Sequence, residues 1–362
     1  MKLRIDLEAY RSNLRALQAR IAPAELMAVV KDDAYGHGLD QIVRAARKVG
    51  IVSFAVSDLE TGIRLREERQ LDRERTFAWL IDETDDFAEA IHWDVDLGVS
   101  NIGVLDAIAN AGADKPARVH LKIDSGLRRN GASLDQWQDV LSRARHWSDR
   151  GRLDVVGIWT HIAETSNADD AAAQAVFEEA LAQARASGFT DFQRHFAASG
   201  ASFDHADFRY DAARVGVYAF GIAPGGEKEL AEWDLTAVMS AHATVIDTHN
   251  SDSHDVAVLD SGYLHGVPAW QVPSVGSQGS QLPWSGFDVL LNGRRCPIVR
   301  VLANETHVLT SRPAKTGDPA VLFGSHLRGE PRLHEWSDAF ATVGEELSVR
   351  MGSFNEREFV GE

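Results

Sequence analysis

The segment VVKDDAYGHG, Val29 to Gly38, is the most informative stretch of this 362-residue chain. It begins as an apolar run typical of a buried strand and ends in a turn that contains Gly36 and Gly38. Lys31 stands where the apolar run stops. A lysine at a strand end either extends its charge to solvent or lies in a site where its amine does chemistry. The rest of the sequence is needed to choose between these two interpretations.

Seven more apolar runs follow, separated by amphipathic segments. The eight runs are LMAVVK (26–31), SFAVS (53–57), TFAWL (76–80), DLGVS (96–100), VHLKIDS (119–125), VVGIWTH (155–161), RHFAASG (194–200) and RVGVYAFG (214–221). One separating segment, residues 169–188, is rich in helix formers and ends at a glycine. Alternating strands and helices permit a (β/α)8 barrel or an open doubly wound sheet, and the count of eight favours the barrel.

The pattern changes after Pro224. Short apolar runs now follow one another at 235–246, 255–263, 288–293, 297–302 and 319–324, with turn signals such as Asn292-Gly293 between them. This predicts a β-rich domain with one helix at 332–341 and a long loop over 269–286. The expected domains are a barrel over residues 1–225 and a mainly-β domain over residues 226–362.

Composition narrows the function classes. The net charge of −17 argues against a nucleic-acid partner, because such proteins present a basic face. No apolar run approaches the roughly 18 residues of a membrane span, and the N-terminus lacks the apolar centre of a signal peptide. The single cysteine, Cys296, cannot form an internal disulfide. We therefore expect a cytoplasmic protein that binds neither membrane nor nucleic acid.

Polar residues follow the ends of the expected barrel strands, where barrel enzymes place their catalytic groups. These residues are Lys31, Lys122, Asp124, Arg129, His161, Ser199 and Arg214. A buried lysine can form a Schiff base with a carbonyl, and a serine with backbone N–H groups suits a phosphate. An arginine that faces a ring nitrogen suits pyridoxal phosphate. No metal site is expected.

Over nearly its whole length the chain resembles the alanine racemase family of fold-type III pyridoxal phosphate enzymes. AVVKDDAYGHG (28–38) is similar to the family's lysine signature AVVKANAYGHG. Four further segments match in order: KIDSGLRRNG (122–131), GIWTHIAE (157–164), RVGVYAFGIAP (214–224) and DSGYLHGVP (260–268). The resemblance implies pyridoxal 5'-phosphate as cofactor, an amino acid as substrate, and a barrel followed by a β-domain.

The resemblance also implies cofactor-binding roles. Lys31 would carry the cofactor and act as one proton-transfer base. Tyr35, Ser199 and the backbone N–H groups of Gly216 and Val217 would bind the phosphate. Arg214 would face the pyridine nitrogen.

For the substrate, the resemblance implies that Arg129 holds the carboxylate and that Tyr263 is the second base, positioned by His161. In the family this tyrosine comes from the other subunit, so a head-to-tail homodimer is implied. Lys122 matches a position that is carbamylated in some members.

The match to the family weakens in the second domain. His265 stands for the family's aspartate, Ala303 and Asn304 for a methionine–aspartate pair if one gap is allowed, and Asn355 for a tyrosine at the entrance. Near Lys31, the pair Asp32-Asp33 replaces alanine–asparagine. The changes at Ala303 and Asn355 enlarge the substrate pocket, and Asn304 and His265 add donors. Together they predict serine or a larger polar amino acid as substrate rather than alanine.

Two alternatives remain. A fold-type III amino-acid decarboxylase would carry a glycine-triplet phosphate motif and a cysteine–aspartate pair, but Cys296 lies in RRCPIV with no aspartate beside it. A non-catalytic protein that binds pyridoxal phosphate would resemble the barrel alone, whereas this chain keeps a second domain that bears Tyr263.

Overall fold

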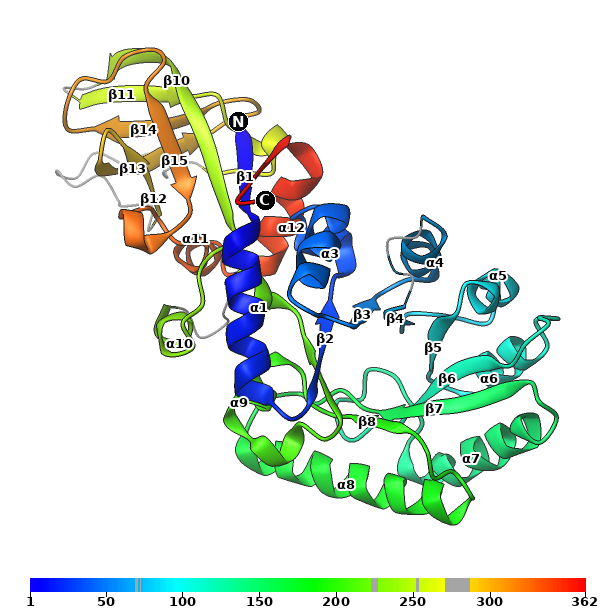
Figure 1. The fold of residues 1–362 in the computed structure, drawn as a ribbon. Coiled ribbons are helices and arrows are strands. Elements are labelled where there is room, and N and C mark those ends of the chain that lie inside the picture. The colour runs from blue at the N-terminus through cyan, green and yellow to red at the C-terminus, as the bar shows by residue number, and fades with distance from the viewer. Residues whose placement is uncertain (69–70, 72, 223–226, 252–253, 271–286) are drawn as a thin grey trace. The chain divides into compact units, whose positions relative to one another are not determined.

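The computed structural model describes residues 1–68, 71, 73–222, 227–251, 254–270 and 287–362 (Figure 1). The chain forms two compact units. The barrel unit comprises Leu17–Lys31 and Ala46–Gly216, and the second unit comprises Met1–Ala16, Asp32–Ala45 and Val217–Glu362. Each unit is described separately below. None of the described helices is both long and apolar enough to cross a membrane.

The barrel unit contains eight parallel strands in the order β8-β7-β6-β5-β4-β3-β2-β9. They are β2 (Glu25–Val29), β3 (Ser53–Val56), β4 (Arg75–Ala78), β5 (Val95–Val99), β6 (Ala117–Lys122), β7 (Leu153–Trp159), β8 (Gln193–His195) and β9 (Ala212–Val215). Backbone N–H groups of Asp211 and Arg214 donate to the carbonyls of Arg194 and Ala197, so β9 also approaches β8 and nearly closes the barrel. The predicted (β/α)8 barrel is confirmed.

Helices precede or connect these strands. They are α1 (Leu7–Ile21), α2 (Lys31–Tyr35), α3 (Leu39–Lys48), α4 (Leu59–Glu67), α5 (Phe87–His92), α6 (Ile102–Ala109), α7 (Leu134–Ser148), α8 (Asn167–Ala186) and α9 (Ser199–Asp204). Local sequence sets where several begin: the side chains of Asp58 and Asn101 accept hydrogen bonds from Thr61 N and Val104 N at the starts of α4 and α6.

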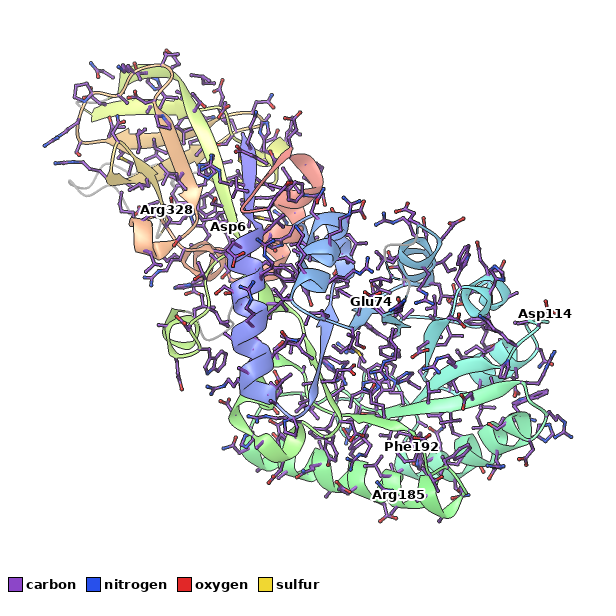
Figure 2. All side chains as sticks on the ribbon, in the orientation of Figure 1. Asp6, Glu74, Asp114, Arg185, Phe192 and Arg328 are labelled. Carbon is purple, nitrogen blue, oxygen red and sulfur yellow. The ribbon has the colours of Figure 1, made fainter. Side chains whose placement is uncertain are left out.

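Side chains fill the space between the strands and the helices of the barrel unit (Figure 2). Phe54, Phe77 and Trp137 are among its largest fully buried residues. Packing extends to its outer face, where the Arg185 guanidinium lies 5.8 Å from the centre of the Phe192 ring. The interior is therefore a packed core that can hold polar side chains in fixed positions.

The second unit contains an eight-stranded sheet in the order β11-β14-β13-β12-β15-β10-β1-β16. Its strands are β1 (Lys2–Asp6), β10 (Met239–Ser251), β11 (His254–Leu259), β12 (Asp288–Leu291), β13 (Arg294–Val301), β14 (Thr306–Thr310), β15 (Pro319–Phe323) and β16 (Arg357–Val360). All pairs are antiparallel except β1 with β16. Besides parts of α1, α2 and α3, the second unit contains the helices α10 (Glu227–Glu232), α11 (Leu333–Ala339) and α12 (Gly344–Phe354). This confirms the predicted mainly-β domain.

Several elements differ from the sequence prediction. The expected barrel domain begins at residue 1, but β1 pairs with β10 and β16 in the second sheet. The run 214–221 was expected to be one strand, whereas β9 ends at Val215 and residues 217–220 form a 3-10 turn. The sequence analysis also missed β14, β16 and α12. Most of the loop expected at 269–286 lies outside the described residues.

Candidate active site

The carboxyl ends of the barrel strands bring the expected polar residues to one edge of the sheet. Lys122 is the last residue of β6, and Arg214 lies in β9. Lys31, His161 and Ser199 follow β2, β7 and β8 by two to four residues. Because parallel strands share one carboxyl edge, these five residues from distant parts of the chain belong to one end of the barrel.

The four residues that follow Lys31 have an unusual backbone conformation. Asp32, Asp33, Ala34 and Tyr35 all have φ between 53° and 54°, which is the left-handed region. For residues with a side chain this costs roughly 1–2 kcal/mol each. Local bonds hold the turn: Asp33 Oδ1 accepts from Leu39 N at 2.8 Å. Strained backbone of this kind clusters at functional sites, so the turn marks the segment after Lys31 as a candidate.

Arg214 is the central side chain of the barrel site, and it is 5% exposed. Its Nη2 donates to Thr160 O at 2.7 Å, to Phe196 O at 3.1 Å and to His161 Nδ1 at 3.3 Å. Its Nη1 donates to the carbonyl and to Nδ1 of His195, both at 3.0 Å. Burial lowers the pKa of Arg214 to about 9. Nε–H has no acceptor among the described residues, which leaves this hydrogen for a ligand.

The contact with Arg214 determines the state of His161. Arginine only donates, so His161 Nδ1 must accept and the ring hydrogen lies on Nε2. Burial holds the pKa of His161 far below its usual range, and the positive charges of Arg214 and Arg129 add to this effect. His161 is therefore a neutral imidazole whose Nε2–H can donate to another group.

Lys122 lies in an apolar and positively charged environment. Its Nζ donates to Asn130 Oδ1 and lies 4.2 Å from the centre of the Trp159 ring. Burial lowers the pKa of Lys122 to about 7, with further contributions from Arg214 and Arg129. A lysine of this kind is substantially neutral, and hence nucleophilic, near neutral pH. Arg129 itself is exposed.

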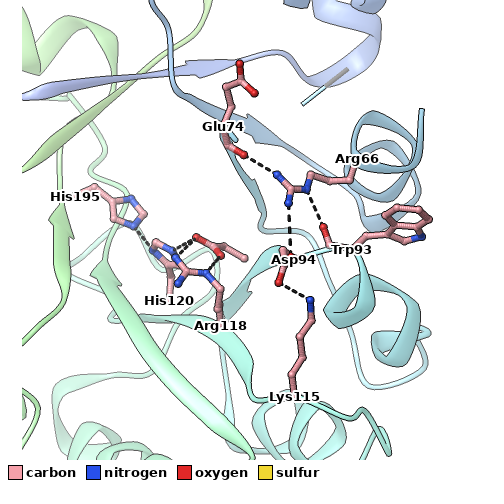
Figure 3. Close-up of polar contacts among 9 residues, drawn as sticks. Arg66, Glu74, Trp93, Asp94, Lys115, Arg118, His120 and His195 are labelled. Carbon is pink, nitrogen blue, oxygen red and sulfur yellow. Dashed lines mark hydrogen bonds and ion pairs between the residues drawn. The ribbon is translucent and has the colours of Figure 1, made fainter. Parts of the chain in front are cut away.

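A buried chain of polar side chains extends from Arg214 into the barrel, and Figure 3 shows its far end. His195 Nε2 lies 2.8 Å from His120 Nδ1, and His120 Nε2 lies 3.3 Å from Asp96 Oδ2. Arg118 Nε also donates to Asp96, at 2.6 Å. Gly157 in β7 makes room for this chain, because a Cβ there would lie 1.9 Å from His120 Nδ1.

The direction of this chain follows from its arginine end. His195 Nδ1 accepts from Arg214, so its hydrogen lies on Nε2 and is donated to His120 Nδ1. His120 must then carry its hydrogen on Nε2 and donate to Asp96. Burial opposes the ionisation of Asp96, but the hydrogen bonds from His120 and Arg118 outweigh it and hold the pKa of Asp96 below its usual range.

The expected phosphate-binding groups are divided between the units. In the barrel unit, Gly216 N donates to Ser199 Oγ at 3.1 Å, so these two groups lie together at the start of α9. Val217 and Tyr35 belong to the second unit. The Tyr35 ring is buried, and its centre lies 5.1 Å from the centre of the Phe220 ring. Burial raises the pKa of the Tyr35 hydroxyl.

Sequence analysis missed one residue beside Ser199. Glu164 accepts a hydrogen bond from Ala201 N at 3.0 Å, in the first turn of α9. Its position three residues after His161 in THIAE was the available signal, but an acidic loop residue is usually a solvated one. A carboxylate at this point competes with any anion for the backbone amide.

In the second unit, the structure brings Tyr263 and Ala303 together. Tyr263 N donates to Leu302 O and Leu264 N donates to Ala303 O, both at 2.9 Å. The Tyr263 ring is 49% exposed, and Asn304 is exposed next to Ala303. The segment around residue 303 therefore supports the turn that carries the tyrosine.

Two family models match the chain: the alanine racemase N-terminal domain over residues 5–224 and the alanine racemase C-terminal domain over residues 242–359. The chain belongs to the alanine racemase family. Enzymes of this family are racemases that use pyridoxal 5'-phosphate, and the chain is an enzyme of this class.

Whole-length relatives agree with this assignment. The alanine racemase of Beutenbergia cavernae is 34% identical, with 99% of this chain and 97% of the relative aligned. That of Salinispora tropica is 33% identical over 97% and 96%. The crystal structure of alanine racemase from D-cycloserine-producing Streptomyces lavendulae has a TM-score of 0.89 at 29% identity, covering 100% of this chain and 97% of that one.

The residues of this alanine racemase family member fit pyridoxal phosphate. Nε–H of Arg214 is free of protein acceptors in the described part of the chain, which suits a ring nitrogen. Ser199 Oγ accepts from Gly216 N, so the serine keeps its hydroxyl hydrogen to donate to a phosphate. Lys31 stands at the same carboxyl edge with an amine for the aldehyde.

We expect D96N to lose about 1–3 kcal/mol of unfolding free energy near neutral pH, since hydrogen bonds to buried charged groups contribute this much. Because the folded pKa of Asp96 lies below the unfolded value, its contribution is present above the unfolded pKa and disappears as pH falls through the folded pKa. The stabilities of D96N and the parent protein should therefore converge in acid. Urea unfolding at neutral pH and at several acidic pH values measures this difference.

The exposed Asp114 supplies the control, because D114N removes the same charge without a buried partner. Equal stability of D96N and D114N at neutral pH would contradict the inferred series of hydrogen bonds from Arg214 to Asp96.

Proposed function

We propose that the protein racemises an amino acid by moving the α-hydrogen between two bases, Lys31 and Tyr263. The observation that carries this proposal is the hydrogen-bond pattern of Arg214. It leaves Nε–H for a ring nitrogen and makes His161 an Nε2–H donor. These are the two properties that racemisation with pyridoxal phosphate requires of the barrel site.

When bound, pyridoxal phosphate supplies the aldehyde that binds the substrate amine and a ring that draws electron density from Cα. Lys31 Nζ would hold the aldehyde carbon, while Ser199, Gly216, Val217 and Tyr35 would bind the phosphate. Arg214 Nε–H would donate to the ring nitrogen. With a pKa of about 9, Arg214 keeps its proton near neutral pH and would leave that nitrogen unprotonated, which would limit electron withdrawal and disfavour transamination.

Racemisation requires a base on each face of Cα. Lys31 Nζ serves one face and Tyr263 Oη the other. To accept the hydrogen, Tyr263 has to be present as the phenolate, which the site must favour. The neutral His161 supports this, because its Nε2–H can donate to the phenolate oxygen, with the Arg214 charge behind it.

We also propose a homodimer in which Tyr263 of one subunit completes the site of the other. The support is the half-exposed Tyr263 ring on the second unit together with the family resemblance. A cytoplasmic location stays a prediction. Membership of the family through both domain models favours the racemase over the decarboxylase and the non-catalytic alternatives.

Arg129 is proposed to hold the substrate carboxylate, oriented by a carbamate on Lys122. The support for the carbamate is the lowered pKa of Lys122, which makes its amine available to attack CO2. The new N–C bond forms as a C–O π bond of CO2 opens, and the amine proton passes to solvent. The resulting anion would pair with the exposed guanidinium of Arg129.

The Lys31 assignment predicts where the cofactor becomes attached. Borohydride treatment of the protein loaded with pyridoxal phosphate should abolish its visible absorption band and fix the label on the peptide that contains Lys31. The nearby Lys122 is the natural competitor, so K122A should label normally and K31A should not label at all. Covalent label on another lysine in K31A, located by peptide mass spectrometry, would refute the assignment.

The Tyr263 assignment predicts a selective loss. Y263F keeps the ring and removes the proton-transferring oxygen, so racemisation should fall by at least about 10²-fold, the low end for a positioned acid–base group. Exchange of the α-hydrogen by Lys31 should survive better. Both rates can be followed in D2O by NMR and chiral chromatography. Unchanged racemisation in both directions would remove Tyr263 from the mechanism.

We propose that the pocket accepts side chains larger than that of alanine. Ala303 stands where the family has methionine, and the structure places its backbone beside the Tyr263 turn. The smaller side chain leaves room, while Asn304 adds an exposed amide. Alanine would leave a void that a longer side chain fills, and fit of this kind shifts discrimination by about 1–3 kcal/mol.

Steady-state assays on alanine, serine, glutamine, lysine and ornithine test this pocket. We expect serine or a larger polar amino acid to match or exceed alanine in kcat/KM, and A303M to shift the preference back toward alanine. A preference for alanine of more than about tenfold in the parent protein would show the pocket argument to be wrong.

A further inference from the structure

Tyr263 lies on a segment with little structure of its own. It is the first residue of a three-residue 3-10 turn, Tyr263–His265, whose own bonds are His265 N to Gly262 O at 2.8 Å and Gly266 N to Tyr263 O at 3.2 Å. The ring is half exposed. The direction in which Tyr263 Oη points therefore depends on how the rest of the second unit holds this turn.

One side of the turn rests on the backbone of residues 302–303. Besides the bonds from Tyr263 N and Leu264 N, Gly262 packs so closely that a Cβ would lie 2.4 Å from Leu302 O and 2.5 Å from Ala303 O. This contact holds the start of the turn against residues 302–303. The end of the turn, at His265 and Gly266, has to be held by other residues.

His265 closes the turn through its own side chain. Gly262 N donates to His265 Nδ1 at 3.1 Å, so the imidazole accepts at Nδ1 and carries its hydrogen on Nε2. Desolvation and the positive N-terminus lower the pKa of His265, although Asp260 opposes this, and the ring keeps its accepting lone pair. The His265 side chain therefore links the end of the turn back to Gly262, the residue before Tyr263.

Asn355 attaches the same turn to α12. Its Nδ2 donates to His265 O and to Met351 O, both at 2.8 Å. The reverse orientation of the amide would set Oδ1 against two carbonyl oxygens, so Nδ2 must be the atom between them. Gly266, at φ 83°, packs so closely that a Cβ would lie 2.9 Å from Met351 Cα. Both ends of the turn are thereby held.

We propose that His265 and Asn355 form a positioning clamp that aims Tyr263 for proton transfer. This inference rests on the proposed function and deepens it. Both residues stand where the sequence departs from its family, and their side chains contact backbone rather than open space. The two departures therefore hold the turn that carries the base.

The clamp makes a selective prediction, because only one of the two bases depends on it. H265F keeps a planar ring but removes the acceptor for Gly262 N. We expect the ratio of inversion to α-hydrogen exchange with retention to fall at least about tenfold, since misplacement of a catalytic group by about 1 Å costs up to 10²-fold. Both enantiomers of an accepted amino acid are incubated in D2O, and both rates come from one sample.

Rescue and control variants separate positioning from general damage. H265N restores an acceptor near Nδ1 and should restore the ratio, whereas N355D, an isosteric change without the amide donors, should lower it as H265F does. H146F, which alters a histidine on the outer helix α7, should leave the ratio unchanged. Exchange with retention requires folded, loaded enzyme, so a partly unfolded sample does not change the ratio.

The double variants distinguish the clamp from the two-base proposal. In a Y263F background, H265F and N355D should cause no further fall in the ratio. If Y263F lowers the ratio and H265F does not, the clamp is refuted and the two bases stand. If Y263F itself leaves the ratio unchanged, the proposed function fails.

Discussion

An arginine donates hydrogen bonds and cannot accept them, and at Arg214 this constraint organises the whole barrel site. Its Nη hydrogens engage three carbonyl oxygens and two imidazole nitrogens. Each imidazole must present a lone pair to the guanidinium. His161 consequently offers a hydrogen to a ligand, and His195 passes one inward to His120 and from there to Asp96. One buried side chain thus sets the tautomers of three histidines.

This arrangement also answers how a buried guanidinium is tolerated. Taking such an ion out of water costs several kcal/mol unless its hydrogens are bonded and its charge is balanced. Among the described residues no carboxylate bonds Arg214. Carbonyl oxygens accept its hydrogens instead, and the negative charge of Glu164 partly offsets the effect of burial on its pKa. Since the polar chain from Arg214 to Asp96 joins β5, β6, β8 and β9, the bonds that tune Arg214 also hold the barrel strands together, and stability and chemistry share the same contacts.

The barrel and the polar residues at its strand ends could be predicted from the sequence, because apolar runs and their ends are local signals. It could not show the chain behind Arg214. Asp96, His120 and His195 lie in expected strands, and only the order of those strands makes them neighbours. The sequence did not reveal the pairing of β1 with β16 for the same reason, because residues 2–6 pair with residues near 357. The contact of Asn355 with His265 spans 90 positions of sequence and left no local pattern.

The structure also changes the interpretation of the altered second domain. The sequence suggested that His265 adds a donor for a polar substrate and that the loss of a ring at Asn355 opens the entrance. Asn355, however, has two amide hydrogens, and both are donated to carbonyls. His265 Nδ1 is likewise taken by Gly262 N. Asn355 therefore cannot donate to a substrate without leaving the carbonyl of His265 or of Met351 unpaired, which costs about 1–3 kcal/mol. The proposed recognition of a larger amino acid can therefore use the space beside Ala303, Asn304 and Nε2–H of His265, while Asn355 acts on the turn that carries the tyrosine.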